Sequence, residues 1–139
     1  MSQIQTVETI ILDTIKNEFQ NFDVESFPVD FSNYHFTSSL GCILVKFNSA
    51  EFNEQNTIWN VNQDYTLSFD IISGYRGLTT YNEVYPLQQN LKNILQGLEI
   101  LGRKITLKKE EIFKEVNTDI FCKITCKIYL TSEETENEE

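Results

Sequence analysis

Few side chains in this sequence combine the residue type and the spacing that catalysis or metal binding requires. His35 is the only histidine, so any triad or general-base mechanism that uses imidazole would depend on it. Glu110 and Glu111 are adjacent carboxylates, but lysines precede and follow them, and ion pairing on a solvated strand accounts for the pair. Phosphate-binding glycine loops and the short motifs of zinc peptidases and serine hydrolases do not occur in the sequence. We therefore expect no enzyme activity.

The three cysteines, Cys42, Cys122 and Cys126, do not have the spacing of a zinc site. Cys122 and Cys126 alternate with apolar residues in a strand-like segment, so both side chains should point to the same face of a sheet. Four residues of extended chain would separate the two sulfurs by about 13 Å, which is too far for a disulfide bond. We predict that both pack in the core as small apolar side chains, beside Leu67 or Phe69. No metal or cofactor is expected.

The composition is that of one folded domain. The chain has 139 residues, of which 40% are hydrophobic and 23% are charged. At this size roughly two-thirds of the unfolded surface can be buried, so neither disulfides nor a structural metal are needed. No apolar segment approaches the ~20 residues of a membrane span, and the first residues lack the pattern of a signal peptide. We expect a cytoplasmic protein that does not bind membranes.

The charge is strongly acidic and uneven along the chain. Eleven basic and 21 acidic residues give a formal net charge of −10, which disfavours direct nucleic-acid binding because a phosphate backbone is itself negative. Five glutamates fall within residues 133–139, after the last apolar residue. We predict a single domain over residues 1–131 and a disordered acidic tail over 132–139, because dense like charges repel and bury no apolar surface. The alternative is that the tail docks on a basic partner.

The N-terminal segment has the spacing of an amphipathic helix. Apolar residues recur with a period near 3.6 from residue 4 onward, and Ser2 followed by Gln5 has the pattern of a capping box. The helix should end near residue 21. Residues 22–27 then run extended into Pro28, which disfavours helical geometry in the residue before it, so a short strand is expected.

A second amphipathic helix is predicted from about residue 82 to residue 97. Thr80 and Glu83 have the spacing of a second capping box. Pro86 is compatible with this helix only in the first turn, where amide hydrogens have no intrahelical partner.

Four longer segments are typical of strands: residues 40–47, 57–73, 104–116 and 119–131. The first is almost continuously apolar, the second alternates from Tyr65 onward, and the last two are joined by a tight turn. The order is helix, three strands, helix, two strands. We therefore predict an α+β domain with a mostly antiparallel sheet and two helices packed on one face.

The strand predicted over residues 57–73 is too long for the domain. A straight strand of that length spans about 55 Å, whereas a compact domain of this size is roughly 35–40 Å across. One interpretation is a projecting β-hairpin that carries Phe52, Trp59 and Val61 to another subunit, because one chain can cover little of such an arm. The other is a bulged strand that folds back on its own sheet. Both interpretations stay open.

The order of several short motifs resembles a family of small structural proteins of Mu-like phages and prophages. These motifs are Phe27-Pro28, Tyr34-His35-Phe36, Leu40-Gly41 before Leu44-Val45, and Tyr75-Arg76-Gly77 before the second helix. The resemblance covers nearly the whole chain except the acidic tail. Members of that family are similar to tail-terminator, or tail-completion, proteins of long-tailed phages, which form a ring on the head-proximal end of the tail tube.

The resemblance implies a structural protein of the virion tail that is assembled in the host cytoplasm. Its partners would be further copies of itself in a ring of six, the tail tube, the sheath protein where a tail has one, and the connector at the neck of the head. The residues expected at subunit or partner interfaces are Phe52, Trp59, Val61, Tyr75 and Arg76.

Two other functions stay open. One is a head-tail connector, or stopper, bound to the portal, which is also a small ring former without an active site. The other is a bacterial module that binds a small ligand or a peptide between the second helix and the sheet. A deep pocket around Trp59 or Tyr75 in a monomer would favour the ligand-binding module.

Overall fold

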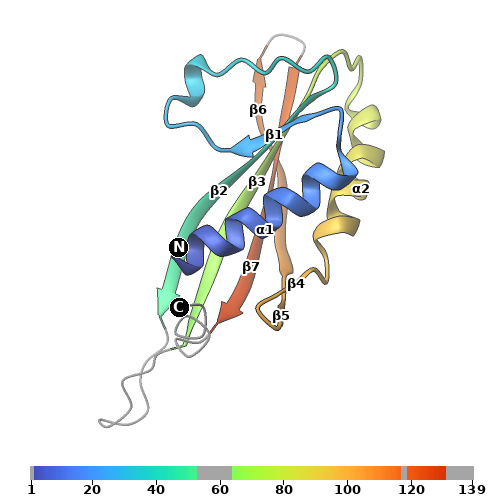
Figure 1. Ribbon diagram of the computed structural model, residues 1–139. Coiled ribbons are helices and arrows are strands. Elements are labelled where there is room, and N and C mark those ends of the chain that lie inside the picture. The colour runs from blue at the N-terminus through green and yellow to red at the C-terminus, as the bar shows by residue number, and fades with distance from the viewer. Residues whose placement is uncertain (1, 53–63, 117–118, 131–139) are drawn as a thin grey trace, which may run out of the picture.

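A computed structural model describes residues 2–52, 64–116 and 119–130 of the chain. Two helices, seven strands and two 3-10 turns follow one another along it (Figure 1). In chain order they are α1 (Gln3–Glu18), β1 (Asp23–Ser26), η1 (Phe31–Asn33), β2 (Gly41–Phe52), β3 (Tyr65–Tyr75), η2 (Tyr81–Glu83), α2 (Val84–Leu95), β4 (Glu99–Ile100), β5 (Arg103–Lys104), β6 (Thr106–Val116) and β7 (Asp119–Leu130). Among these described residues, neither helix is long and apolar enough to cross a lipid bilayer.

Five strands form one sheet in the order β1-β2-β3-β7-β6. Only β1 runs parallel to its neighbour, and the other three pairs are antiparallel. The predicted α+β class and mostly antiparallel sheet are therefore confirmed. The hairpin of β4 and β5 was not predicted, because two-residue strands are too short to show an alternating pattern.

Both helices pack on the same face of the sheet. Val7, Ile11 and Ile15 of α1 and Leu91 and Leu95 of α2 have no exposed surface, and they share one apolar cluster with alternate residues of the three central strands. The sheet residues of this cluster are Ile43, Val45, Leu67, Phe69, Ile71, Ile124, Cys126 and Ile128. In Figure 1, α1 crosses in front of these strands. Each such side chain contributes about 1.5–3 kcal/mol on burial, so this face holds the domain together.

The ends of the helices agree only in part with the sequence signals. Ser2 Oγ accepts from the Gln5 amide at 3.1 Å and the Gln5 side chain accepts from the Ser2 amide at 2.9 Å, which confirms the first capping box. The capping box at Thr80 is wrong, because the Glu83 carboxylate accepts from the amide and hydroxyl of Thr79 instead. Pro86 lies in the first turn of α2, as predicted.

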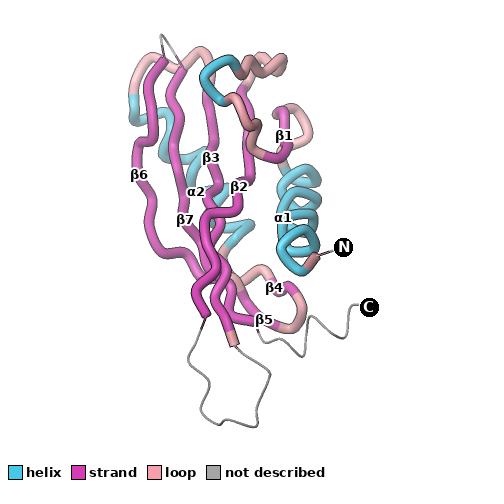
Figure 2. Tube along the Cα trace, turned by 90° about the vertical axis from the view of Figure 1, so that its left-hand side faces the viewer, coloured by secondary structure: helices cyan, strands magenta, loops and turns pink. Residues whose placement is uncertain are grey.

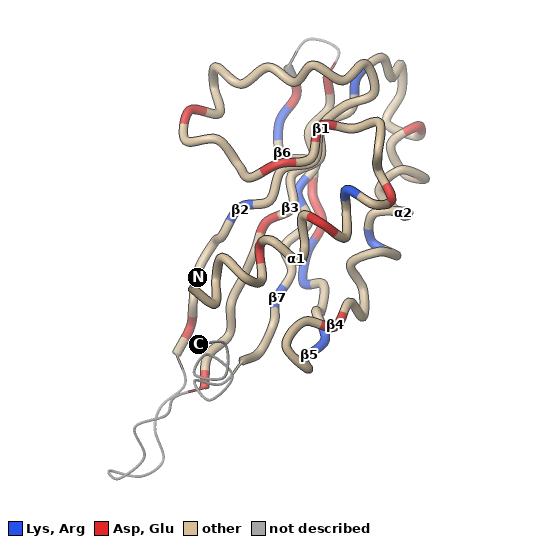
Figure 3. The backbone as a smooth tube through the Cα atoms, viewed as in Figure 1, with Lys and Arg blue, Asp and Glu red and all other residues tan. Residues whose placement is uncertain are grey.

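Among the described residues, an aromatic cluster covers part of the opposite face of the sheet. Phe27, Phe31, Tyr34 and Phe36, from the segment around η1, pack there against the ring of Phe121 and its neighbours. The remainder of this face, which we call the open face, consists of residues whose side chains alternate away from the helices. Those of the central rows are Lys46, Ser68, Asp70, Lys109, Glu111, Lys123, Thr125 and Lys127. Figure 2 shows the molecule turned by 90°, so that the left-hand side of Figure 1 faces the viewer. In Figure 3, blue segments mark lysine or arginine positions along β6 and β7.

The β2–β3 pair ends level with β7 in the described part of the chain. Phe52 pairs with Tyr65, which pairs in turn with Leu130. A β-bulge between Phe47 and Ser49 bends β2. The rest of the arm predicted from the sequence, including Trp59 and Val61, lies outside the described residues.

Candidate functional site

Three of the five residues predicted at interfaces are described by the structure, and these three do not form one site. Phe52 ends β2 with 64% of its surface exposed, and its ring lies 5.5 Å from that of Tyr65. Tyr75 has no exposed surface, so the prediction that its side chain meets a partner is corrected: it is a core residue beneath α2. Arg76 is the next residue along the chain, and 39% of its side chain is exposed. Trp59 and Val61 are not among the described residues.

A buried hydrogen-bond network explains the position of Tyr75. The hydroxyls of Tyr75 and Ser73 both donate to Oε1 of Gln88, at 2.5 and 2.6 Å. The Gln88 amide donates to Glu110 at 3.0 Å, and Glu110 also accepts from Lys92 at 2.9 Å. Burial is the main influence on the pKa of Tyr75 and raises it above its usual range. The phenol therefore keeps its proton and acts as a hydrogen-bond donor. The network joins β3, α2 and β6.

A groove lies outside this network, between α2 and the edge strand β6. Its volume is about 320 Å³, and Tyr85, Gln88, Lys92, Glu110, Ile112 and Cys122 are among the residues that line it. Tyr85 is 62% exposed and Ile112 is 47% exposed. β6 ends the strand order, so in the described part of the chain no strand pairs with its outer edge. Exposed apolar groups beside unpaired strand edges are typical of interaction surfaces, and we call this one the α2–β6 groove.

A second surface lies on the opposite edge of the sheet. β1 pairs only with residues 42–45 of β2. The outer edge of β2 from Lys46 to Phe52 therefore has no neighbouring strand among the described residues. We call this segment, with the exposed ring of Phe52, the β2 edge. It differs in sequence and shape from the α2–β6 groove.

Arg76 is held by the loop before β2 and the start of β7. Its guanidinium lies 4.0 Å from the centre of the Phe36 ring, Nε lies 3.6 Å from Asp119, and Nη1 donates to the Ser38 carbonyl at 3.4 Å. A stacked and paired arginine of this kind fixes the loop to the sheet. The exposed part of its side chain remains accessible to a partner.

Two glycines bring these segments together. The start of β2 at Gly41 pairs with the end of β3 at Tyr75, and a Cβ on Gly41 would lie 2.0 Å from the Gly74 carbonyl oxygen. A Cβ on Gly74 would lie 2.4 Å from the Phe121 ring. A side chain larger than hydrogen does not fit at either position, which explains why Gly41 and Gly74 are glycines.

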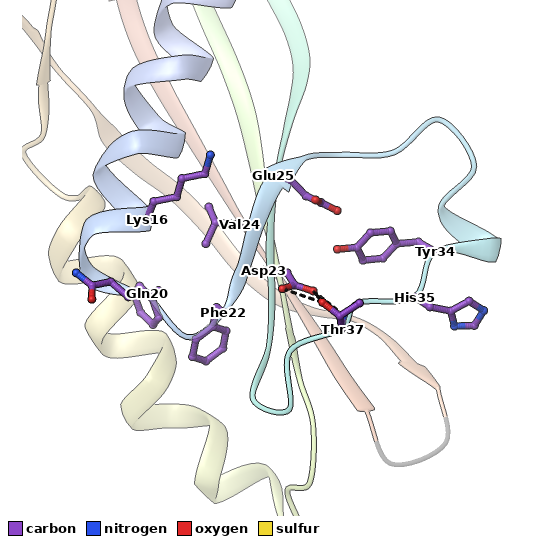
Figure 4. A pocket seen from close by; sticks show the side chains of 10 residues that line it. Lys16, Gln20, Phe22, Asp23, Val24, Glu25, Tyr34, His35 and Thr37 are labelled. Carbon is purple, nitrogen blue, oxygen red and sulfur yellow. Dashed lines mark hydrogen bonds between the residues drawn. The ribbon is translucent and has the colours of Figure 1, made fainter.

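A hollow with a volume of about 580 Å³ lies between α1, β1 and the segment 34–37 (Figure 4). The Asp23 carboxylate accepts there from the amides of Thr37 and Ser38 at 2.6 and 3.2 Å. Burial acts against ionisation of Asp23, but these hydrogen bonds outweigh it and lower the pKa of the carboxyl. His35 is exposed and points away from Asp23 in Figure 4. The carboxylate therefore orders the loop before β2.

The three cysteines are buried, as predicted for Cys122 and Cys126. Cys126 pairs with Phe69, and Cys122 pairs with Ser73 and packs beside Tyr75. Burial raises the pKa of Cys42 and Cys126 to about 12 and that of Cys122 to about 11. Within residues 2–52, 64–116 and 119–130, no cluster of three or more His, Cys, Asp or Glu residues could hold a metal ion.

Sequence reasoning missed the exposed residues of the α2–β6 groove. One signal was available: Ile112 and Phe113 are the only large apolar residues in a charged stretch of β6. The sequence around Tyr85 carries no such signal, because the position of the groove depends on packing between α2 and a strand some 20 residues later.

The comparisons with known proteins add no family to this description. No family model matches the sequence, and no curated protein matches it. The resemblance to phage tail proteins therefore stays an expectation that rests on the order of the motifs in the sequence.

Proposed function

We propose that this protein is a tail-terminator, or tail-completion, subunit that forms a ring on the head-proximal end of a phage tail tube. The observation that carries the proposal is the presence of two different exposed surfaces, the α2–β6 groove and the β2 edge, on opposite edges of one sheet. A contact between unlike surfaces repeats from subunit to subunit and closes into a ring when the rotation fits. Six subunits are expected from the resemblance.

The composition of the two surfaces supports this contact. Tyr85 and Ile112 offer large exposed side chains in the groove, and Phe52 offers an aromatic ring at the β2 edge. Aromatic side chains often dominate the binding energy of interfaces. The wall of the groove is preformed, because Gln88 and Glu110 are fixed by hydrogen bonds within the subunit. A preformed surface loses less conformational entropy on binding.

In this proposal the ring acts by capping. One side of the ring lies on the last layer of the tail tube and blocks the addition of further tube subunits, and the other side receives the connector of the head. The net charge of −10 suits a channel for DNA, since negative walls do not retain a phosphate backbone. No catalytic step is required.

A peptide-binding module is the second candidate function. The α2–β6 groove, at about 320 Å³, falls within the range of roughly 300–1,000 Å³ that is usual for ligand sites. An added peptide strand could also pair with the outer edge of β6. In that case the groove would bind a segment of another protein, and no ring would form.

Deleting the gene from the genome that encodes it, and measuring tails by electron microscopy, tests the proposed function. Loss of a terminator should give tails of uncontrolled length that do not join heads. Loss of a connector gives tails of normal length beside separate heads. Normal infectious particles would reject both assembly functions and favour the peptide-binding module.

A further inference from the structure

A second hollow lies where the segment around η1 meets the end of β6 and the start of β7. Its volume is about 280 Å³. The rings of Phe31, Phe36 and Phe121 line it together with Arg76 and Lys114. None of its described lining residues belongs to the α2–β6 groove or to the β2 edge. We call it the aromatic hollow.

The rings form a fixed apolar wall. Phe36 and Phe121 are buried, and their ring centres lie 6.2 Å apart, edge to face. The ring of Phe31 meets that of Phe121 in the same way at 5.5 Å. Rings held by such packing lose little conformational freedom when another group packs against them. The wall is therefore ready to receive the apolar part of a ligand.

Two cations lie over these rings. The Arg76 guanidinium lies 4.0 Å from the centre of the Phe36 ring, and Lys114 Nζ lies 5.5 Å from that of Phe31. Of the five N–H groups of the guanidinium, one faces a carboxylate and one donates to a carbonyl oxygen, and the other three have no partner within the described residues. Lys114 Nζ has no ion-pair partner in the same part of the chain. Both cations therefore retain donors for a ligand.

The residues that line the hollow carry one net positive charge. Arg76 and Lys114 are cations, Asp119 is the single carboxylate among the lining residues, and His35 is counted as neutral. One excess positive charge matches a carboxylate, which carries one negative charge. A phosphate monoester carries about −1.5 to −2 at pH 7 and matches it less well.

The carboxylates of neighbouring segments make other contacts. Asp30 accepts from the hydroxyl of Ser32 at 2.8 Å and from the amide of Asn33 at 2.6 Å, within the turn η1. Asp23 and Glu25 line the hollow of Figure 4 instead. None of these three lines the aromatic hollow, so its excess charge is left for a ligand.

We propose that the aromatic hollow binds a glutamate side chain of a partner protein. Arg76 and Lys114 hold the carboxylate by charge-assisted hydrogen bonds, and the rings receive the two methylene groups of the side chain. The volume lies below the roughly 300–1,000 Å³ that is usual for small-molecule sites, which favours a single side chain as the occupant. The proposal does not depend on the ring, because the hollow shares no described residue with either of the proposed contact surfaces.

An NMR titration of the isotope-labelled full chain tests the proposal. The probe is the blocked tripeptide acetyl-Ala-Glu-Ala-amide, and its matched control is acetyl-Ala-Gln-Ala-amide. The first peptide should shift the amide signals of Phe36, Arg76 and Phe121. The second should bind about tenfold more weakly or less, because hydrogen bonds to a charged group are lost.

Two lysine variants identify the cation that acts. Lys114→Gln should weaken binding of the glutamate peptide about threefold or more, because one charge-assisted contact is lost. Lys108→Gln is the matched control, since Lys108 is an exposed lysine of the same strand that does not line the hollow. Its effect should be small. Both variants keep the packed rings, so the fold should be unchanged.

The other outcomes overturn the proposal. Equal binding of the two peptides would show that the hollow does not recognise a carboxylate, and equal effects of the two lysine changes would show a general effect of charge. Shifts confined to the α2–β6 groove would place the peptide there instead. Inorganic phosphate that causes the same shifts at a lower concentration would assign the hollow to phosphate. None of these results bears on ring formation, which is measured by oligomer mass.

Discussion

Gln88 is the side chain on which the α2–β6 groove depends most. One carbonyl oxygen accepts from two buried hydroxyls, and the amide of the same side chain reaches Glu110 on β6. Gln88 itself is only 4% exposed, so its polar atoms have no water to replace these partners. Burying an amide without hydrogen bonds costs a few kcal/mol, which is why the network fixes α2 over the sheet.

The first prediction concerns Tyr75→Phe. Removing the hydroxyl deletes one of the two bonds to Gln88 and should lower the free energy of unfolding by about 1 kcal/mol, while Ser73 keeps the Gln88 oxygen partnered. Urea denaturation measures the loss. Because the ring of Tyr75 is buried, oligomer mass should stay the same. A loss of assembly with no change in stability would contradict this prediction and indicate that Tyr75 contacts a partner.

The second prediction concerns the pH dependence contributed by Asp23. Its pKa is lowered in the folded state from an ordinary value of 3.8, so its stabilising effect is fully present above that value and is lost as the pH falls through the lower folded-state pKa. Asp23→Asn should cost about 1 kcal/mol or less at pH 7, since the site is largely open to solvent. The difference from the unmodified protein, measured by urea denaturation, should shrink as the pH falls below 3.8 and through the lower folded-state pKa. A difference that is constant with pH would contradict the prediction.

The third prediction concerns the reactivity of the cysteines. All three are buried, and burial raises the pKa of each thiol to between about 11 and about 12, so little thiolate is available at neutral pH. A thiol reagent should label the native protein slowly and the urea-unfolded protein rapidly at all three positions. Rapid labelling of Cys122 in the folded protein would show that α2 opens from the sheet.

At the scale of helices and strands, patterns in the sequence correctly predicted the features that depend on contacts between residues close together in the chain. The period of α1, the capping box at Ser2 and the alternation of β3 each follow from neighbouring residues, and the structure has them. The predicted capping box at Thr80 does not form, because the Glu83 carboxylate accepts from the amide and hydroxyl of Thr79 and the Thr80 side chain makes no capping bond. The parallel pairing of β1 was not visible, since four residues carry no signal for strand direction. The α2–β6 groove could not be predicted from local patterns, because it depends on contacts between residues some 20 positions apart in the sequence.

The fourth prediction places the interface on the β6 edge. Ile112→Lys should weaken assembly about tenfold or more, because a charged side chain would replace an apolar one in the groove. Leu40→Lys is the matched control, since Leu40 is 46% exposed against 47% for Ile112 and lies at neither edge surface. Both variants should unfold at nearly the same urea concentration as the unmodified protein. Analytical ultracentrifugation over a concentration series compares them, and equal effects of the two changes would exclude the groove.

At the scale of the whole molecule, the form of the proposed assembly depends on the two edges of the sheet. A twofold dimer uses the same surface on both subunits, whereas a ring uses two different surfaces, one from each neighbour. The α2–β6 groove and the β2 edge are different surfaces on opposite edges of the sheet, because β1 pairs only with residues 42–45 of β2. In the proposed ring, the open face and the helices lie between the two contacts, where the proposed tube and connector partners would reach them.

The most direct measurement mixes two variants, each with one damaged surface. Ile112→Lys alters the α2–β6 groove and Phe52→Glu alters the β2 edge, and both side chains are exposed in the subunit. By native mass spectrometry, at concentrations where the unmodified protein forms its oligomer, each variant alone should be a monomer. An equimolar mixture should give a dimer that contains one copy of each, joined through the single intact contact. A mixture that stays monomeric, or an unmodified protein that is monomeric at every concentration, would contradict the heterologous ring.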